Sequence, residues 1–146
     1  MTQPWRVVVG VDGSEDSRRA LVWAADLVGG SRGEVIAVHA LGLLAHVDGA
    51  PVVPSTGYRS EVTVRLEQQW CRPLIDSSVA HHCVVVDGDP VNALLNAAQE
   101  QTADLVVVGR RGASGHPETL IGSTSGQLVH RADIPVVVVP PEPPRS

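Results

Sequence analysis

Five short apolar runs rich in valine constrain the fold of this chain more than any other feature of its sequence. Their residues are almost continuously apolar, rather than alternating between apolar and polar. Runs of this kind are typical of strands that are covered on both faces. The predicted strands are Trp5–Val9, Val35–His39, Cys83–Val86, Leu105–Val108 and Val136–Val139.

Stretches with helical periodicity separate these runs, at Ser14–Val28, Glu61–Cys71, a segment that begins at Asp89-Pro90, and Ser123–His130. Ser14 and Asp89 are suitable N-caps, and Pro90 fits the first helical position. Pro73 is expected to break or kink the second helix. The alternation of strand and helix predicts an α/β fold with a doubly wound, five-stranded parallel sheet and right-handed crossovers.

The 146 residues fit one domain at 1–140, followed by a Pro-rich, disordered tail at 141–146. The segment Leu41–Arg59 contains several glycines and prolines and is expected to be a long loop, functional or mobile. A net charge of −5 argues against a nucleic-acid partner. The N-terminus lacks a secretory signal pattern, and no apolar run approaches the roughly 20 residues of a membrane helix, which predicts a soluble cytoplasmic protein.

All eleven basic residues are arginine, and the absence of lysine excludes a Walker A loop and Schiff-base chemistry. A phosphate site in this chain must therefore use backbone N–H groups, hydroxyls and arginines such as Arg110. The two cysteines, Cys71 and Cys83, form no C-x-x-C motif, which favours ordinary reduced thiols over a disulfide.

The segment after the fourth predicted strand, GRRGASGHPETLIGSTSG, is the first candidate site. Gly109 lets the backbone approach a ligand closely, and Gly112 suits a turn with positive φ. The start of the following helix offers free N–H groups, a favourable dipole for an anion, and the hydroxyls of Ser123, Thr124 and Ser125. A glycine-rich connection that only turns the chain explains the same residues equally well.

The segment VVVGVDGSEDS after the first strand is the second candidate. Asp12 lies just beyond the strand, where its carboxylate suits a ribose hydroxyl or a base amine. The alternative is an Asx turn and helix cap made by Asp12, Ser14 or both. Carboxyl ends of parallel strands share one edge of the sheet, so the two glycine-rich loops converge there and favour a nucleotide.

Other chemistry has weaker support. The run His81-His82-Cys83 contains metal-ligand types, but it enters a strand, where neighbouring side chains point to opposite faces, so no metal site is predicted. No G-x-S-x-G elbow supports a hydrolase triad. The tryptophans, which are expected to fill the core or an interface rather than bind a cofactor, are Trp5, Trp23 and Trp70.

The spacing Gly109, two residues, Gly112, nine residues, Gly122-Ser123 resembles the phosphate-binding signature of the universal stress protein family. The similarity covers nearly the whole chain, through VVVGVDGSEDSRRALVWAA, VIAVHAL, VDGDPVNALLNAAQEQTADLVVVGRRG and IPVVVV. The resemblance implies a Rossmann-like or flavodoxin-like three-layer sandwich, with residues 1–140 as a single universal stress protein domain. It also implies a stress-response or signalling module without strong catalysis.

The resemblance further implies ATP, accompanied by Mg²⁺, across the carboxyl edge of the sheet. Asp12 would contact the adenosine, and the backbone of Ala40 would meet the base. The residues that would hold the ribose and phosphates are Gly109, Arg110, Gly112, Gly122, Ser123, Thr124 and Ser125. Many members of the family are homodimers joined through the last strand, which is Val136–Val139 in this chain.

The stretch ASGHPETLI between Gly112 and Gly122 departs from similar proteins. Pro117 stiffens it, and Glu118 brings a negative charge toward the expected phosphates, so AMP or cyclic AMP is an alternative to ATP. A second alternative is a dimerisation module of the same fold that binds no nucleotide. A third, an adenylating enzyme of the PP-loop type, has little support because the loop begins Asp-Gly-Ser and the chain leaves no substrate domain.

Overall fold

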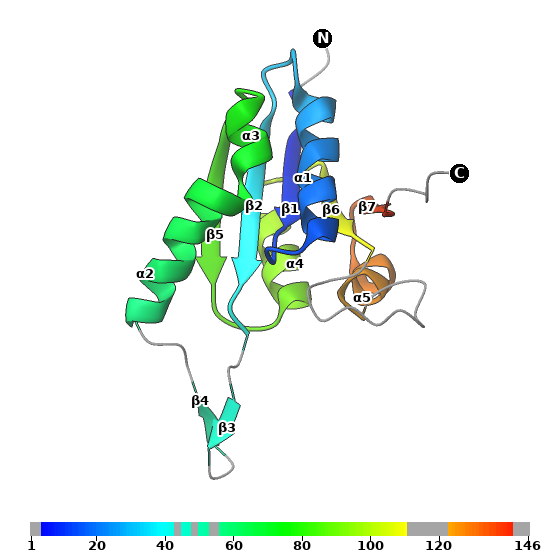
Figure 1. Cartoon of the computed structure of the whole chain (residues 1–146). Helices are drawn as coiled ribbons and strands as arrows, with labels where there is room; N and C mark the ends of the chain where they lie inside the picture. Colours follow the sequence, from blue (N-terminus) through cyan, green and yellow to red (C-terminus); the bar gives the residue numbers. More distant parts are fainter. Residues whose placement is uncertain (1–3, 43–44, 48–49, 53–55, 111–122, 142–146) are drawn as a thin grey trace, which may run out of the picture.

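A parallel sheet of five strands, in the order β5-β2-β1-β6-β7, forms the centre of the molecule in the computed structural model (Figure 1). The structure describes residues 4–42, 45–47, 50–52, 56–110 and 123–141. The predicted doubly wound α/β sheet is confirmed, with each strand within two residues of its expected bounds. The strands are β1 (Arg6–Gly10), β2 (Glu34–Ala40), β5 (His81–Val86), β6 (Leu105–Gly109) and β7 (Val136–Val139).

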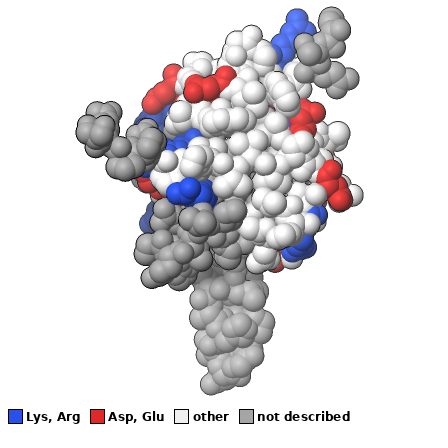
Figure 2. Space-filling model, turned by 90° about the vertical axis from the view of Figure 1, so that its right-hand side faces the viewer, with Lys and Arg blue, Asp and Glu red and all other residues white. Residues whose placement is uncertain are grey.

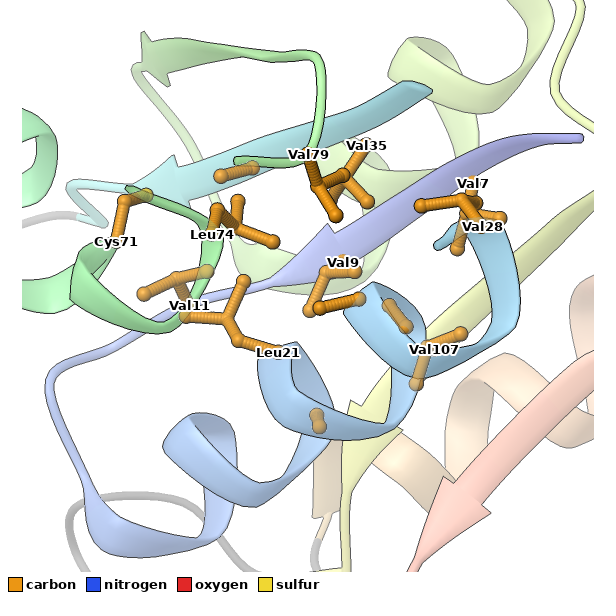
Figure 3. Packing of buried hydrophobic residues seen from close by; sticks show 14 of the residues in the cluster. Val7, Val9, Val11, Leu21, Val28, Val35, Cys71, Leu74, Val79 and Val107 are labelled. Atoms are coloured by element: carbon orange, nitrogen blue, oxygen red, sulfur yellow. The ribbon is translucent and has the colours of Figure 1, made fainter. Parts of the chain in front are cut away.

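Helices cover both faces of this sheet. Successive residues of each strand point to opposite faces, so a continuous apolar run gives both faces apolar side chains to bury. Val7 and Val9 pack with helix α1 (Glu15–Val28), whereas Val8 packs with helices α4 (Pro90–Glu100) and α5 (Ser123–Arg131). Figure 3 shows the first layer, in which Leu21 of α1 lies with the valines of β1. Both core layers are almost entirely aliphatic, and this explains why the apolar runs predicted the strands so well.

The predicted helix Glu61–Cys71 is longer and more irregular than expected. It comprises α2 (Thr56–Arg65), a π-helical turn η1 (Leu66–Trp70) and a short α3 (Arg72–Asp76). The backbone N–H of Cys71 donates to the carbonyl of Leu66 at 3.0 Å, the wide spacing of a π-turn. Pro73 lies in the first turn of α3, where its missing N–H costs nothing, so the predicted interruption is confirmed just before the proline.

The expectation of a continuous loop over Leu41–Arg59 is wrong. Two short strands, β3 (Ala45–Val47) and β4 (Ala50–Val52), pair antiparallel, and α2 already begins at Thr56. The sequence between the two strands is Asp-Gly, a pair typical of two-residue hairpin turns. A strand of three residues is too short to show a recognisable pattern of apolar residues, so the Asp-Gly pair was the main sequence indication of this hairpin.

Two of the three tryptophans do not fill the core. Trp5 is 41% exposed and Trp23 is 37% exposed, so neither fills the core, and the other expected role, at an interface, stays a prediction for both. Only Trp70 is partly buried against the aliphatic cluster beneath α1. Among the described residues, no helix is both long and apolar enough to cross a bilayer.

Candidate functional site

The carboxyl ends of β1 and β6 define the candidate site. These neighbouring strands are the point where the chain reverses direction across the sheet: α1 leads from β1 toward β2, and α5 leads from β6 toward β7. Ligands of doubly wound sheets bind in the crevice at such a point. The β1–α1 loop and Arg110 therefore meet where a ligand is expected.

Asp12 and Ser14 shape the β1–α1 loop. The Asp12 carboxylate accepts hydrogen bonds from the backbone N–H of Ser14, at 2.9 Å, and from its hydroxyl. Ser14 Oγ in turn accepts from the N–H of Ser17, at 3.1 Å, as the N-cap of α1. Both parts of the Asx-turn alternative are thus present, and they hold the Asp12 carboxylate in a fixed position at the sheet edge.

Trp70 and His39 support this loop from the side. Gly13 has φ +82, and a Cβ there would lie 2.8 Å from the indole ring of Trp70. The rings of Trp70 and His39 meet edge to face, with centroids 5.1 Å apart. The Nδ1–H of His39 donates a hydrogen bond to the carbonyl of Val11 at 2.6 Å. The sequence offered no signal for either residue at the site, because their proximity depends on the packing of η1.

Gly109 has a packing role that the sequence did not suggest. A Cβ at this position would lie 2.6 Å from the carbonyl carbon and oxygen of Asp16, in the first turn of α1. The absence of a side chain therefore lets β6 approach the N-terminus of α1. The end of β6 and the first turn of α1 are thus in direct backbone contact.

Arg110 joins three elements through its backbone. Its N–H donates to the carbonyl of Val139 in β7 at 3.1 Å, and its carbonyl accepts from the hydroxyl of Ser125 in α5 at 3.1 Å. Ser125 is only 2% exposed, so this hydroxyl anchors the first turn of α5 to the end of β6. Arg110 Nε is buried and has no hydrogen-bond partner within the described ranges.

The other predicted site residues fall into two groups. Ala40 ends β2 at the same edge, and Thr124 lies partly exposed in the first turn of α5. Gly112 and Gly122 lie outside the described residues, as does the stretch with Pro117 and Glu118. Ser123 begins α5, and its backbone is described. The structure thus brings Asp12, Ala40, Gly109, Arg110, Thr124 and Ser125 to one edge of the sheet.

A groove of about 380 Å³ lies nearby, between α1 and the η1–α3 segment. Its lining includes Gly13 and Trp70 but neither Asp12 nor Arg110. Its lining carries charges of both signs, with three carboxylates, from Glu15, Asp26 and Asp76, and two arginines, Arg18 and Arg72. No group of three or more metal-ligating side chains occurs in the parts of the chain that the structure describes.

The model of the universal stress protein family matches residues 5–140 of this chain. The chain belongs to the universal stress protein family. Universal stress protein Rv1636 of Mycobacterium tuberculosis is 32% identical to it over 139 residues, which cover 91% of this chain and 94% of the relative.

Two solved structures of universal stress proteins show the same fold. One, a crystal structure in complex with cAMP, is 28% identical with a TM-score of 0.68 and covers 92% of this chain and 95% of its own. The other, a family member from Arabidopsis thaliana with AMP bound, is 18% identical with a TM-score of 0.66 and covers 95% of this chain and 93% of its own. The expected Rossmann-like architecture is therefore confirmed.

Proposed function

We propose that this universal stress protein binds an adenine nucleotide across the carboxyl ends of β1 and β6. The observation that carries the proposal is the convergence of the Asp12 loop with the N-terminus of α5 at the point where strand order reverses. The solved relative at 28% identity that holds cAMP supports the choice of ligand class. Stress response or signalling, through binding rather than catalysis, is the proposed role.

Each side of the crevice offers groups for a different part of a nucleotide. We assign the adenosine contact to Asp12, whose carboxylate is held by Ser14, and the base contact to the backbone of Ala40, which ends β2 at the same edge. On the opposite side, helix α5 has no acidic residue in its first turn, so its N–H groups and dipole favour phosphate. Arg110, with its unpaired buried Nε among the described residues, adds a positive charge there.

The remaining phosphate and ribose contacts are proposed for Gly109, Gly112, Gly122, Ser123, Thr124 and Ser125. Ser125 donates its hydroxyl proton to the carbonyl of Arg110, so its oxygen contributes to the ligand site as an acceptor while the same bond holds α5 in place. ATP with Mg²⁺ is the first candidate ligand. AMP and cyclic AMP carry less negative charge and better tolerate Glu118 in the adjoining stretch.

We also propose that the protein forms a homodimer through β7. This strand lies at the end of the sheet, so one row of its backbone N–H and C=O groups faces no other strand of the described ranges. Figure 2 views the molecule from the side that carries β7 in Figure 1, and charged side chains are sparse on that face. Helix α5 contacts this strand and carries Val129, an apolar residue that is 53% exposed.

Calorimetric titration with ATP, ADP, AMP and cyclic AMP tests the nucleotide proposal. We expect at least one of them to bind, and we expect Gly122→Leu to weaken that binding at least tenfold, about 1.4 kcal/mol, because a side chain would obstruct the phosphates. Gly57→Leu is the matched control, since a Cβ at this α2 position meets nothing within 4 Å. Absence of binding at millimolar nucleotide, with the dimer intact, would favour the alternative of a dimerisation module.

A further inference from the structure

Cys71 and Cys83 form a thiol pair that the proposed nucleotide site does not use. They lie 12 positions apart in the chain, and packing brings their sulfur atoms to 3.5 Å, within a hydrogen bond in which either thiol can donate. Cys71 follows the π-turn η1, and Cys83 lies in the edge strand β5. Both are free thiols, as the sequence predicted, but they are in direct contact.

We propose that a hydroperoxide oxidises Cys71 and Cys83 to a reversible intramolecular disulfide. The two sulfurs need to close from 3.5 Å to the ~2.05 Å of an S–S bond. The backbone around the pair can supply this movement, because among the described strands β5 pairs with β2 alone and Cys71 lies at the junction of two helical segments. The inference does not depend on nucleotide binding.

The two thiols have different environments, which assigns them different roles. Cys71 is fully buried at 0% exposure, whereas Cys83 is partly exposed and open to a small oxidant. The hydrogen bond from Cys71 lowers the pKa of the Cys83 thiol. That same hydrogen bond, together with burial, raises the pKa of Cys71. Cys83 is therefore the attacking thiolate, and Cys71 is the resolving thiol.

The reaction proceeds in two steps. The Cys83 thiolate attacks one oxygen of hydrogen peroxide, the O–O bond breaks, and Cys83 sulfenic acid and hydroxide form. The Cys71 sulfur then attacks the Cys83 sulfur, the S–O bond breaks, and the hydroxyl group leaves as water with the Cys71 proton. In total the two thiols lose two electrons and two protons, and the peroxide is reduced to two molecules of water.

Formation of the disulfide would alter the candidate site by moving Trp70. This residue immediately precedes Cys71, and its indole lies against Gly13 and the ring of His39. A displacement of Cys71 toward β5 therefore moves the side chain that supports the Asp12 loop. Trp5 and Trp23 lie on the surface and serve as internal references.

Thiol counting and intact mass provide the first test. The reduced protein, freed of reductant and treated with a small excess of hydrogen peroxide, should fall from two titratable thiols to none. The monomer should lose the mass of two hydrogens, and dithiothreitol should restore it. Two remaining thiols, addition of oxygen without disulfide formation, or cross-linked dimers would overturn the proposal.

Single-cysteine variants test the assignment of roles. In Cys71→Ser, and in Cys71→Ala as a second variant for this buried position, Cys83 sulfenic acid should accumulate and be captured by dimedone. Circular dichroism confirms that each variant folds. In Cys83→Ser, the buried Cys71 should give little adduct at the same dose; equal labelling of the two cysteines would contradict the order of attack.

Indole N–H resonances in a ¹H–¹⁵N spectrum report the coupling to the site. On oxidation the resonance of Trp70, assigned with Trp70→Phe, should shift while those of Trp5 and Trp23 stay in place. An unchanged Trp70 resonance in a fully oxidised sample would contradict the coupling, although the disulfide itself would stand.

Discussion

Two glycines at the candidate site show how one residue type meets different demands. Gly13 adopts a φ of +82 beneath Trp70, a backbone conformation that other residues rarely take. Gly109 needs no unusual conformation; it is required because the backbone of Asp16 lies where a Cβ would be. The second demand can be tested by a stability measurement that is independent of ligand binding.

We expect Gly109→Ala to lower the free energy of unfolding by about 1–3 kcal/mol, the usual cost of overpacking. The obstructing atoms belong to the backbone of α1, so no side chain can rotate away. Urea denaturation measures the effect. Gly57→Ala, in open space within α2, is the control and should be neutral or up to about 1 kcal/mol stabilising. A Gly109→Ala protein as stable as the wild type would show that α1 and β6 can separate without cost.

At the scale of single residues, the sequence identified groups with local partners better than groups with distant ones. The Asx turn of Asp12 and the cap of Ser14 were among its predicted alternatives, because each acts within a few residues of itself. The support from Trp70 and His39 could not be predicted, since it depends on where η1 packs over the sheet. The contact between Cys71 and Cys83 was missed for the same reason.

Among the secondary-structure elements, length and regularity decided what could be predicted. The sheet strands and helices α1 and α4 were located from valine runs, helical spacing and N-caps. The π-turn η1 was missed because it changes the register of a helix by one residue without altering its composition. The hairpin of β3 and β4 was missed because its strands are only three residues long.

The edge strand β7 exposes backbone N–H groups on its outer side, where the proposed dimer would form. The carbonyls of Pro135 and Val139 accept hydrogen bonds from the N–H groups of Val106 in β6 and of Arg110 directly after it. Because successive residues of a strand direct their backbone groups to opposite sides, the N–H of Val138 points away from β6. Val138→Pro should leave β7 paired with β6 and prevent a second copy from pairing with it. Light scattering after size exclusion should find a dimer for the wild type and a folded monomer for the variant.

Val137→Pro is the matched control for this experiment, because it removes an N–H on the side that faces β6 and should reduce stability as well. A wild-type protein that is monomeric at micromolar concentrations would contradict the proposed interface, as would a Val138→Pro variant that remains a dimer.

For the molecule as a whole, strand order matters more than any single motif. The order β5-β2-β1-β6-β7 brings the β1–α1 loop and Arg110, far apart in the sequence, to one edge of the sheet. Cys83 of β5 contacts Cys71, which follows η1, and the preceding residue, Trp70, contacts His39 and Gly13 beside the Asp12 loop. Through these contacts we propose that the state of the thiol pair affects the proposed nucleotide site.

Chemical-shift mapping of backbone amides during titration with ATP or cyclic AMP tests the nucleotide proposal most directly. We predict that the largest shifts occur at Asp12, Ala40, Arg110 and Thr124, while Thr102, at the opposite end of the sheet, is unaffected. The account would be contradicted if millimolar nucleotide caused no shifts, or if the shifts were confined to the groove between α1 and α3.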